Sequence, residues 1–300
     1  TIGNLVTEIG KYEYYNCSGL DTVSIGSSVS EIGSSAFEGC RNLKSISIPG
    51  SVNSIDNYAF NECYSLANLR FEDSPNTLHL GYAFTNADNQ SGPYRGYGLF
   101  HYCSLRSIYL GRNLSYDSSY LYGFSPFIGP SNHIYDVTIG GYVTEIGDNA
   151  FIGCSMSELT IPENVTKIGK SAFKGWQKLT KLVIPASVRS IGNEAFAGCT
   201  SLSEVRIEDG YGYLYTYVNI FGECPLRDVY VGKNVTYENS KDNLNSPFFE
   251  KTTIKSVEFG NLMFKIETEM FKGCSALVSV TFGKGCDEIG NSAFGGCPVE

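Results

Sequence analysis

This chain of 300 residues has little histidine, tryptophan or methionine and no surplus of positive charge. Its three histidines are His79, His101 and His133, and none lies in a His-Glu-x-x-His, Gly-x-Ser-x-Gly or phosphate-loop motif. The formal net charge of -9 argues against nucleic-acid binding, which needs a basic face that displaces counterions from phosphates. The sequence therefore predicts a protein that is not an enzyme, with no catalytic residue, no cofactor and no nucleic-acid partner.

Long apolar runs and targeting segments are also lacking. No apolar run is long enough to cross a bilayer, so we expect no membrane span in this chain. A starting Met and a basic-then-apolar signal segment are both absent, which indicates a mature chain or an excised piece.

What is abundant is cysteine and tyrosine, with 10 and 21 residues. Cysteine recurs every 23 residues at Cys17, Cys40 and Cys63, and Cys274 and Cys297 have the same spacing. Trp176 takes this position between Cys154 and Cys199. The surrounding residues recur too, and one copy consists of Ile32-Gly33, Ala36-Phe37, Cys40, Leu43, Ile46 and Ile48-Pro49. Such self-similarity is typical of a solenoid built from stacked coils.

Each repeat predicts one coil of that solenoid. Ile46-Ser47-Ile48 alternates apolar and polar residues, which predicts a strand with one buried face. Val52-x-x-Ile55 is a second apolar pair, expected on the opposite side of the coil. Ala59-Phe60-x-x-Cys63-x-x-Leu66 has helical spacing over a turn or two. We count about twelve coils in residues 1–300, which predicts one continuous solenoid domain.

The pattern Leu-x-x-Ile-x-Ile-Pro-x-x-Val-x-x-Ile-Gly-x-x-Ala-Phe-x-x-Cys resembles the leucine-rich repeat of the BspA-like family, and the resemblance covers nearly the whole chain. It implies an α/β solenoid: a right-handed superhelix of short parallel β-strands on the concave side, with turns and brief helical segments. It also implies a bacterial surface or secreted protein, and so an extracellular or cell-surface location. The fold alone does not fix a ligand.

Two regions depart from the regular coil in the same way. The segment "CSLRSIYLGRNLSYDSS" (103–119) matches "CPLRDVYVGKNVTYENS" (224–240) without a gap. Coils of this variant kind cover 67–134 and 203–254 and hold fourteen of the 21 tyrosines. A block of about five coils therefore occurs twice, which resembles an internal duplication.

Most conspicuous side chains are predicted to be structural. Equivalent cysteines in stacked coils point in parallel, so their Cβ atoms are too far apart for disulfides, and no Cys-x-x-Cys pair suggests zinc. We therefore expect buried free thiols. The acidic turns Glu72-Asp73 and Glu208-Asp209 lack a calcium-loop continuation, so no metal site is predicted. The phenylalanines expected in the core are Phe37, Phe60, Phe151, Phe173, Phe196 and Phe271.

Candidate ligand contacts lie among the outward residues of the concave strands. The duplicated block places Arg70 beside Tyr109, and again Arg206 beside Tyr230, on adjacent coils. Arg and Tyr anchor many interfaces, but a cross-strand Arg–Tyr stack that only packs the sheet surface is an equal alternative. The extra loop 81–99 adds further candidate contacts at Tyr82, Tyr94 and Tyr97.

Three functions remain open at this point. The first is a protein- or glycoprotein-binding adhesion module, whose partners by family resemblance are host matrix proteins, mucosal glycoproteins or other cell-surface macromolecules. The second is a structural spacer that presents another domain and binds nothing. The third is a glycan-binding module in which exposed tyrosines stack on sugar rings.

Overall fold

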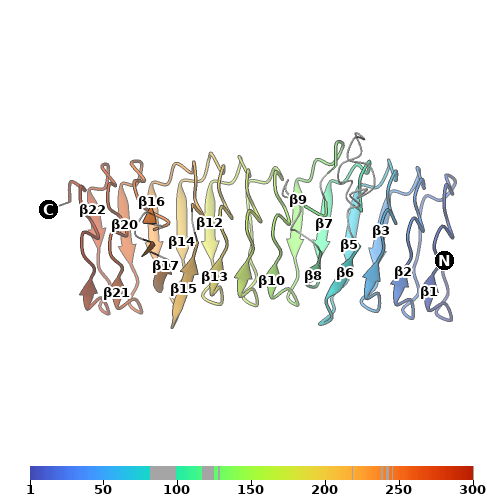
Figure 1. Ribbon diagram of the computed structural model, residues 1–300, viewed down its shortest axis with the longest axis horizontal. Helices are drawn as coiled ribbons and strands as arrows, with labels where there is room; N and C mark the ends of the chain where they lie inside the picture. Colours follow the sequence, from blue (N-terminus) through green and yellow to red (C-terminus); the bar gives the residue numbers. More distant parts are fainter. Residues whose placement is uncertain are drawn as a thin grey trace. The chain divides into compact units, whose positions relative to one another are not determined.

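The computed structural model describes residues 1–81, 99–116, 125–127, 129–217, 219–237, 239–240, 243–244 and 246–299. The chain forms two compact units, Thr1–Phe151 and Ile152–Glu300. Each unit is built from stacked coils that follow one another in chain order (Figure 1). The prediction that all coils form one continuous solenoid, with variant coils at 67–134 and 203–254, stays a prediction.

The coils of unit 1 build two parallel sheets. The first sheet contains the Ile-x-Ile strands in the order β3 (Ser45–Ile48), β5 (Asn68–Phe71), β7 (Ser107–Leu110) and β9 (Asp136–Ile139). The second sheet has the order β1 (Glu8–Ile9), β2 (Glu31–Ile32), β4 (Ser54–Ile55), β6 (Leu78–Leu80) and β8 (Leu114–Ser115), and β10 (Glu145–Ile146) follows β9 along the chain. Both kinds of strand that the sequence predicts are therefore present, although the coil before β3 contributes only an isolated bridge, Thr22 to Ser45, on the side of the first sheet.

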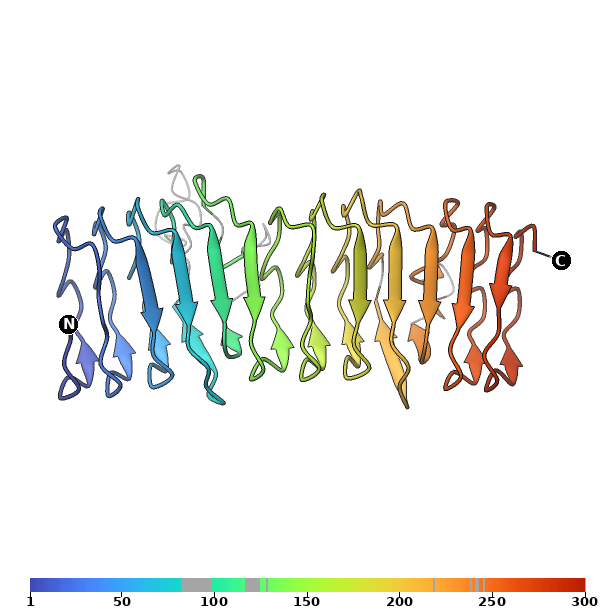
Figure 2. The ribbon, with the colours of Figure 1, turned by 180° about the vertical axis from the view of Figure 1, so that it is seen from behind.

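Unit 2 repeats this arrangement. Its first sheet has the order β12 (Lys181–Ile184), β14 (Glu204–Ile207), β16 (Asp228–Val231), β20 (Ser256–Phe259) and β22 (Ser279–Thr281). Its second sheet runs β11 (Lys167–Ile168), β13 (Ser190–Ile191), β15 (Tyr213–Thr216) and β17 (Asn234–Tyr237), and β21 (Lys265–Ile266) pairs with β23 (Glu288–Ile289). An antiparallel hairpin joins β18 (Asn239–Ser240) to β19 (Asn243–Leu244). Within each unit, the arrows of the first sheet run side by side in one direction (Figure 2).

The expected helical segments are wrong, since the described residues contain strands and turns but no helix. The Ala-Phe-x-x-Cys segment is a run of turns in which two residues of most coils have positive φ, such as Ser35 (55°) and Gly39 (74°). Alternate N–H groups of this run donate to the next coil: Ser35 to Asn57, Phe37 to Ala59, and Gly39 to Asn61. The coil is thus hydrogen-bonded to its neighbour here too, and the fold is a parallel β-solenoid, not an α/β one.

Stacked phenylalanines fill the interior, as the repeat predicts. In unit 1, Phe37 stacks on Phe60 with centroids 5.3 Å apart and planes at 4°. In unit 2, Phe173 stacks on Phe196 at 5.3 Å, and Phe248 stacks on Phe271 at 4.9 Å. All six phenylalanines assigned to the core are fully buried. Stacking between coils therefore buries apolar area that one coil cannot bury alone.

The cysteines are free thiols, and seven of the ten are buried. Most of those in the repeat position donate a weak S–H hydrogen bond to a backbone carbonyl of the preceding coil, for instance Cys63 to Phe37 O (3.2 Å) and Cys274 to Phe248 O (3.2 Å). Cys17, in the first coil, is exposed. Cys286 and Cys297, in the last coils of unit 2, are partly exposed. Cysteine therefore acts in the core as a small apolar residue that also satisfies a carbonyl.

The duplication extends to buried polar contacts that the sequence did not reveal. Arg112 is fully buried and donates to Val52 O (2.6 Å) and Pro49 O (2.8 Å). The matching residue in unit 2, Lys233, donates to Ala186 O (2.8 Å) and Val188 O (3.0 Å). Each buried cation thus holds a turn that lies two coils earlier in the chain. Burial lowers the pKa of Arg112 to about 10 and also lowers the pKa of Lys233.

Within the described ranges, there is no helix of the length and apolarity that crossing a membrane requires.

Candidate binding site

The first sheet of unit 1 brings Arg70 and Tyr109 together, as the sequence predicts. They are register partners on β5 and β7, and the Arg70 guanidinium carbon lies 3.7 Å from the centroid of the Tyr109 ring. The Tyr109 hydroxyl donates to Asp73 Oδ1 at 2.8 Å. Asp73 follows β5, so the acidic turn that the sequence marked supplies the third member of this group.

Unit 2 contains the same group on β14 and β16. The Arg206 guanidinium carbon lies 3.7 Å from the centroid of the Tyr230 ring. The Tyr230 hydroxyl donates to Asp209 Oδ2 at 2.7 Å, and Arg206 Nη2 lies 3.9 Å from the same oxygen. We call these two groups, Arg70/Tyr109/Asp73 and Arg206/Tyr230/Asp209, the Arg–Tyr–Asp clusters. Their agreement shows that the duplicated blocks share side-chain geometry as well as a repeat pattern.

The clusters hold each phenol in its neutral, hydrogen-bonded form. The hydrogen bond to Asp73, followed by burial, raises the pKa of Tyr109. Burial, followed by the hydrogen bond to Asp209, raises the pKa of Tyr230. A phenolate would face a carboxylate at hydrogen-bond distance, so both hydroxyls remain donors at neutral pH.

A glycine makes room for each tyrosine–aspartate contact. A Cβ atom on Gly140 would lie 2.8 Å from both Tyr109 Oη and Asp73 Oδ1. A Cβ on Gly260 would lie 2.8 Å from Tyr230 Oη and closer still to Asp209 Oδ1. The repeat pattern predicted neither glycine and no contact for either aspartate. The signal was a Gly after both β9 and β20, at a position where three other coils have Pro49, Pro162 and Pro185.

Arg206 and Tyr230 of the unit 2 cluster line a shallow depression of about 340 Å³. Besides Arg206 and Tyr230, its lining includes Lys181, Glu204, Asp228 and Glu258. Lys181 Nζ pairs with Glu204 at 3.3 Å, and Ser256 Oγ donates to Asp228 at 2.6 Å. The Ser256 bond lowers the pKa of Asp228. This surface is therefore a set of exposed, mostly paired charges on a regular sheet.

The family model for the BspA type leucine rich repeat region matches six copies, over residues 1–92, 127–242 and 242–300. The chain belongs to the BspA-type leucine-rich repeat family. The resemblance read from the sequence is thereby confirmed. A comparison with curated proteins found no match.

Solved bacterial leucine-rich repeat proteins are similar to this BspA-type chain. One from Bacteroides ovatus is 20% identical, with 97% of this chain and 68% of the other covered and a TM-score of 0.41. One from Eubacterium ventriosum is 17% identical, with 98% and 84% covered and a TM-score of 0.41. A leucine rich cell surface protein from Faecalibacterium prausnitzii is 21% identical, with 94% and 78% covered and a TM-score of 0.30.

Three further contacts predicted for this BspA-type protein fall on the extra loop 81–99. Tyr82, Tyr94 and Tyr97 lie outside the described residues. The acidic turns engage protein groups: besides the Asp73 contact, Glu72 Oε1 accepts from Ser47 Oγ at 2.8 Å. Among the residues that the structure describes, no group of three His, Cys, Asp or Glu side chains could hold a metal ion.

Proposed function

We propose that this BspA-type protein is a non-catalytic binding module that uses the first-sheet faces of its units to hold an extended macromolecule. The proposed partners are a host matrix protein, a mucosal glycoprotein or another cell-surface macromolecule, and the proposed location is extracellular or at the cell surface. The observation that carries this proposal is the Arg–Tyr–Asp cluster, built with the same geometry on the first sheet of both units.

The clusters suit recognition because their side chains are ordered before a partner arrives. The tyrosine ring supports one face of the guanidinium, and the aspartate fixes the phenol. Arg206 remains 44% exposed, so N–H groups are left to donate to a carboxylate, a backbone carbonyl or a sugar hydroxyl. Pre-organised groups lose less conformational entropy on binding than free side chains do.

One observation favours the spacer as the second candidate. In both clusters the tyrosine ring packs on the guanidinium and the phenol is hydrogen-bonded, and in unit 2 Arg206 also lies 3.9 Å from Asp209. Surface groups paired in this way stabilise the sheet by only about 0.2–1 kcal/mol per pair, and they need no ligand. A spacer would keep them for packing alone.

The test is a binding screen against immobilised matrix proteins, mucins and cell-surface glycoproteins. The purified chain is compared with an Arg70→Ala/Arg206→Ala variant, which removes both guanidinium groups and keeps both tyrosine–aspartate bonds. A matched Arg106→Ala/Arg189→Ala variant loses the same charge at exposed arginines outside the clusters.

We expect the cluster variant to bind about tenfold more weakly or worse, with only a small decrease in Tm, while the matched variant binds like the parent. Equal binding by all three proteins would remove the clusters from the interface. If the parent chain binds none of the immobilised molecules, that result would favour the spacer function.

A further inference from the structure

Unit 2 exposes a group of aromatic side chains on its second sheet, away from the Arg–Tyr–Asp cluster. Tyr213 and Tyr215 of β15 are 41% and 56% exposed, and Tyr217, directly after β15, is 49% exposed. Phe264, directly before β21, is 44% exposed. The Tyr213 ring lies 6.4 Å from the Tyr215 ring and 6.0 Å from the Phe264 ring, centroid to centroid. We call these four residues the aromatic platform.

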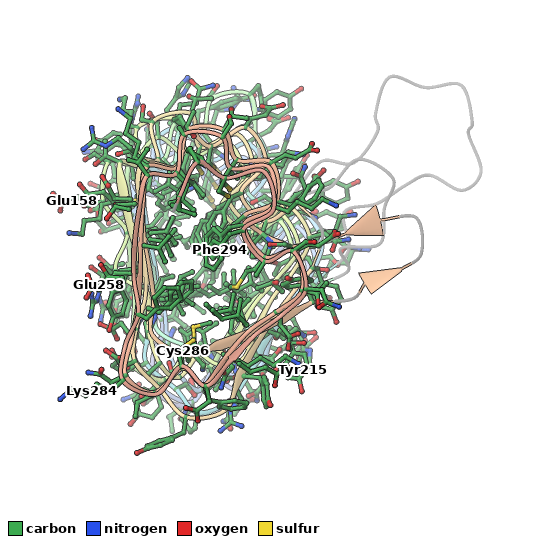
Figure 3. All side chains as sticks on the ribbon, turned by 90° about the vertical axis from the view of Figure 1, so that its left-hand side faces the viewer. Glu158, Tyr215, Glu258, Lys284, Cys286 and Phe294 are labelled. Carbon is green, nitrogen blue, oxygen red and sulfur yellow. The ribbon has the colours of Figure 1, made fainter. Side chains whose placement is uncertain are left out.

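The platform and the first sheet of unit 2 lie on opposite sides of the coil. Figure 3 shows Tyr215 on one side and Glu258, from the first sheet, on the other. The alternation of β15 explains this placement, because Leu214 and Thr216 point inward and are buried while Tyr213 and Tyr215 point outward. A ligand on the platform would therefore not contact the Arg206 cluster, and this inference is independent of the proposed function.

The duplication shows that the fold does not require aromatic residues at these positions. His79 pairs with Ser54 in unit 1 as Tyr215 pairs with Ser190 in unit 2, so β6 corresponds to β15. The residues that match Tyr213, Tyr215 and Tyr217 are consequently Thr77, His79 and Gly81.

The two copies of the block can also be compared at Phe264, the fourth member of the aromatic platform. Asn113 Oδ1 accepts from the Thr144 and Glu145 amides, and Asn234 Oδ1 accepts from the Phe264 and Lys265 amides. Phe264 therefore corresponds to Thr144. All four platform positions hold non-aromatic residues in the first copy of the block, where the same strands still form, so strand formation does not require aromatic residues there.

We propose that the aromatic platform is a binding site for neutral carbohydrate. Three of its four members are tyrosines, which offer an apolar ring beside a hydroxyl group. A hexopyranose has the complementary surface: C–H groups on its ring faces, with hydroxyl groups at its edges. Adjacent rings about 6 Å apart can contact successive sugars of one chain.

The charge next to Phe264 is neutralised, which favours an uncharged ligand at that end of the platform. Lys265, next to Phe264 in the sequence, is held by Glu288 at 3.2 Å and Glu267 at 3.5 Å. The formal net charge of -9 disfavours acidic sugars further.

The experiment titrates the purified chain with neutral oligosaccharides of glucose, galactose, mannose and N-acetylglucosamine, and with sialylated and sulfated oligosaccharides. Binding is followed by calorimetry and by NMR saturation transfer from aromatic protons to sugar C–H protons. The test variant is Tyr213→Thr/Tyr215→His/Phe264→Thr, which installs the residues that unit 1 holds at the matching positions. The control is Tyr135→Thr/Tyr142→Thr, which removes two equally exposed rings from unit 1.

We expect at least one neutral oligosaccharide to bind, with affinity reduced roughly tenfold or more in the platform variant and unchanged in the control. The Arg70→Ala/Arg206→Ala variant should bind it like the parent, which separates this inference from the proposed function. If the platform variant misfolds, saturation transfer in the parent and the single Tyr215→Ala variant provide the same test. Binding of acidic sugars only, equal binding by the platform variant, absence of any glycan binding, or self-association through the platform would each overturn the inference.

Discussion

The repeat-position cysteine is a core residue whose thiol donates to the neighbouring coil. Cys40, Cys63 and Cys274 have this contact, and burial raises the pKa of Cys40 to about 11 and that of Cys274 to about 12. Because the thiolate is the reactive form, we expect iodoacetamide at pH 8 to modify Cys17 in the native protein and to leave these three unmodified. Peptide mass spectrometry measures the modified fraction at each site.

The control for this labelling is the protein in denaturant, where all ten thiols should react. Rapid native labelling of Cys63 would contradict the assignment, because Cys63 is fully buried. Labelling of Cys286 and Cys297, which are partly exposed, should be intermediate in rate.

The glycine beside each Arg–Tyr–Asp cluster sets the position of the tyrosine. In a Gly260→Ala variant, the new Cβ would collide with Asp209 Oδ1 and with the Tyr230 hydroxyl. We expect a loss of about 1–3 kcal/mol in the free energy of unfolding, since the contacting groups belong to a packed sheet surface. Gly141→Ala is the matched control, because a Cβ there meets nothing within 4 Å. Guanidinium chloride titration of both variants makes the measurement, and equal stability would contradict the steric argument.

At the scale of the element, the sequence predicted the strands and the buried residues well. Ile46 and Ile48 alternate with outward residues on β3, and Ile55 marks a strand of the second sheet. The helical segment was wrong because an apolar spacing of three fits a run of tight turns as well as a helix. Tyr58 and Glu62 have positive φ, which excludes a helix. Neither residue type favours positive φ, so the sequence does not predict this backbone conformation.

The candidate site was predictable where register alone determines it. Arg70 meets Tyr109 because equivalent strand positions pair in stacked coils. The contact from Tyr109 to Asp73 depends on how the chain turns after β5, which the repeat pattern does not specify. The aromatic platform around Tyr215 was not predicted for another reason. The sequence does not distinguish an outward residue of the second sheet that contacts a ligand from an ordinary surface residue.

The buried cations Arg112 and Lys233 donate to carbonyls of turns, and we expect this contact to stabilise the protein. Replacing Lys233 with Met removes the donor to Ala186 O and Val188 O and leaves both carbonyls without this partner. We expect a loss of about 1–3 kcal/mol, because an unsatisfied buried polar group costs more than its hydrogen bond contributes. Lys255→Met, at an exposed position of the same unit, is the control and should be nearly neutral. A gain in thermal stability on Lys233→Met would instead mean that burying the charge costs more than its hydrogen bonds return.

At the scale of the whole molecule, each coil is held mainly by its nearest neighbours. Phe196 stacks between Phe173 and Phe221, at centroid distances of 5.3 and 6.0 Å. Truncating it to Ala should cost roughly 3–5 kcal/mol through the cavity left behind. In a solenoid the stability is close to a sum of coil and neighbour terms, so the loss should concentrate around the altered coil.

Hydrogen exchange of the Phe196→Ala variant, followed peptide by peptide, tests this locality. We expect the amides of β12 to β16 to exchange faster and those of β3 and β5 in unit 1 to keep their protection, because β12 to β16 stack directly around the cavity. Val278→Ala is the control, since that side chain is 69% exposed and leaves no cavity. A uniform loss of protection over both units would show that the chain unfolds as one cooperative body, and nearest-neighbour stacking would then not describe its stability.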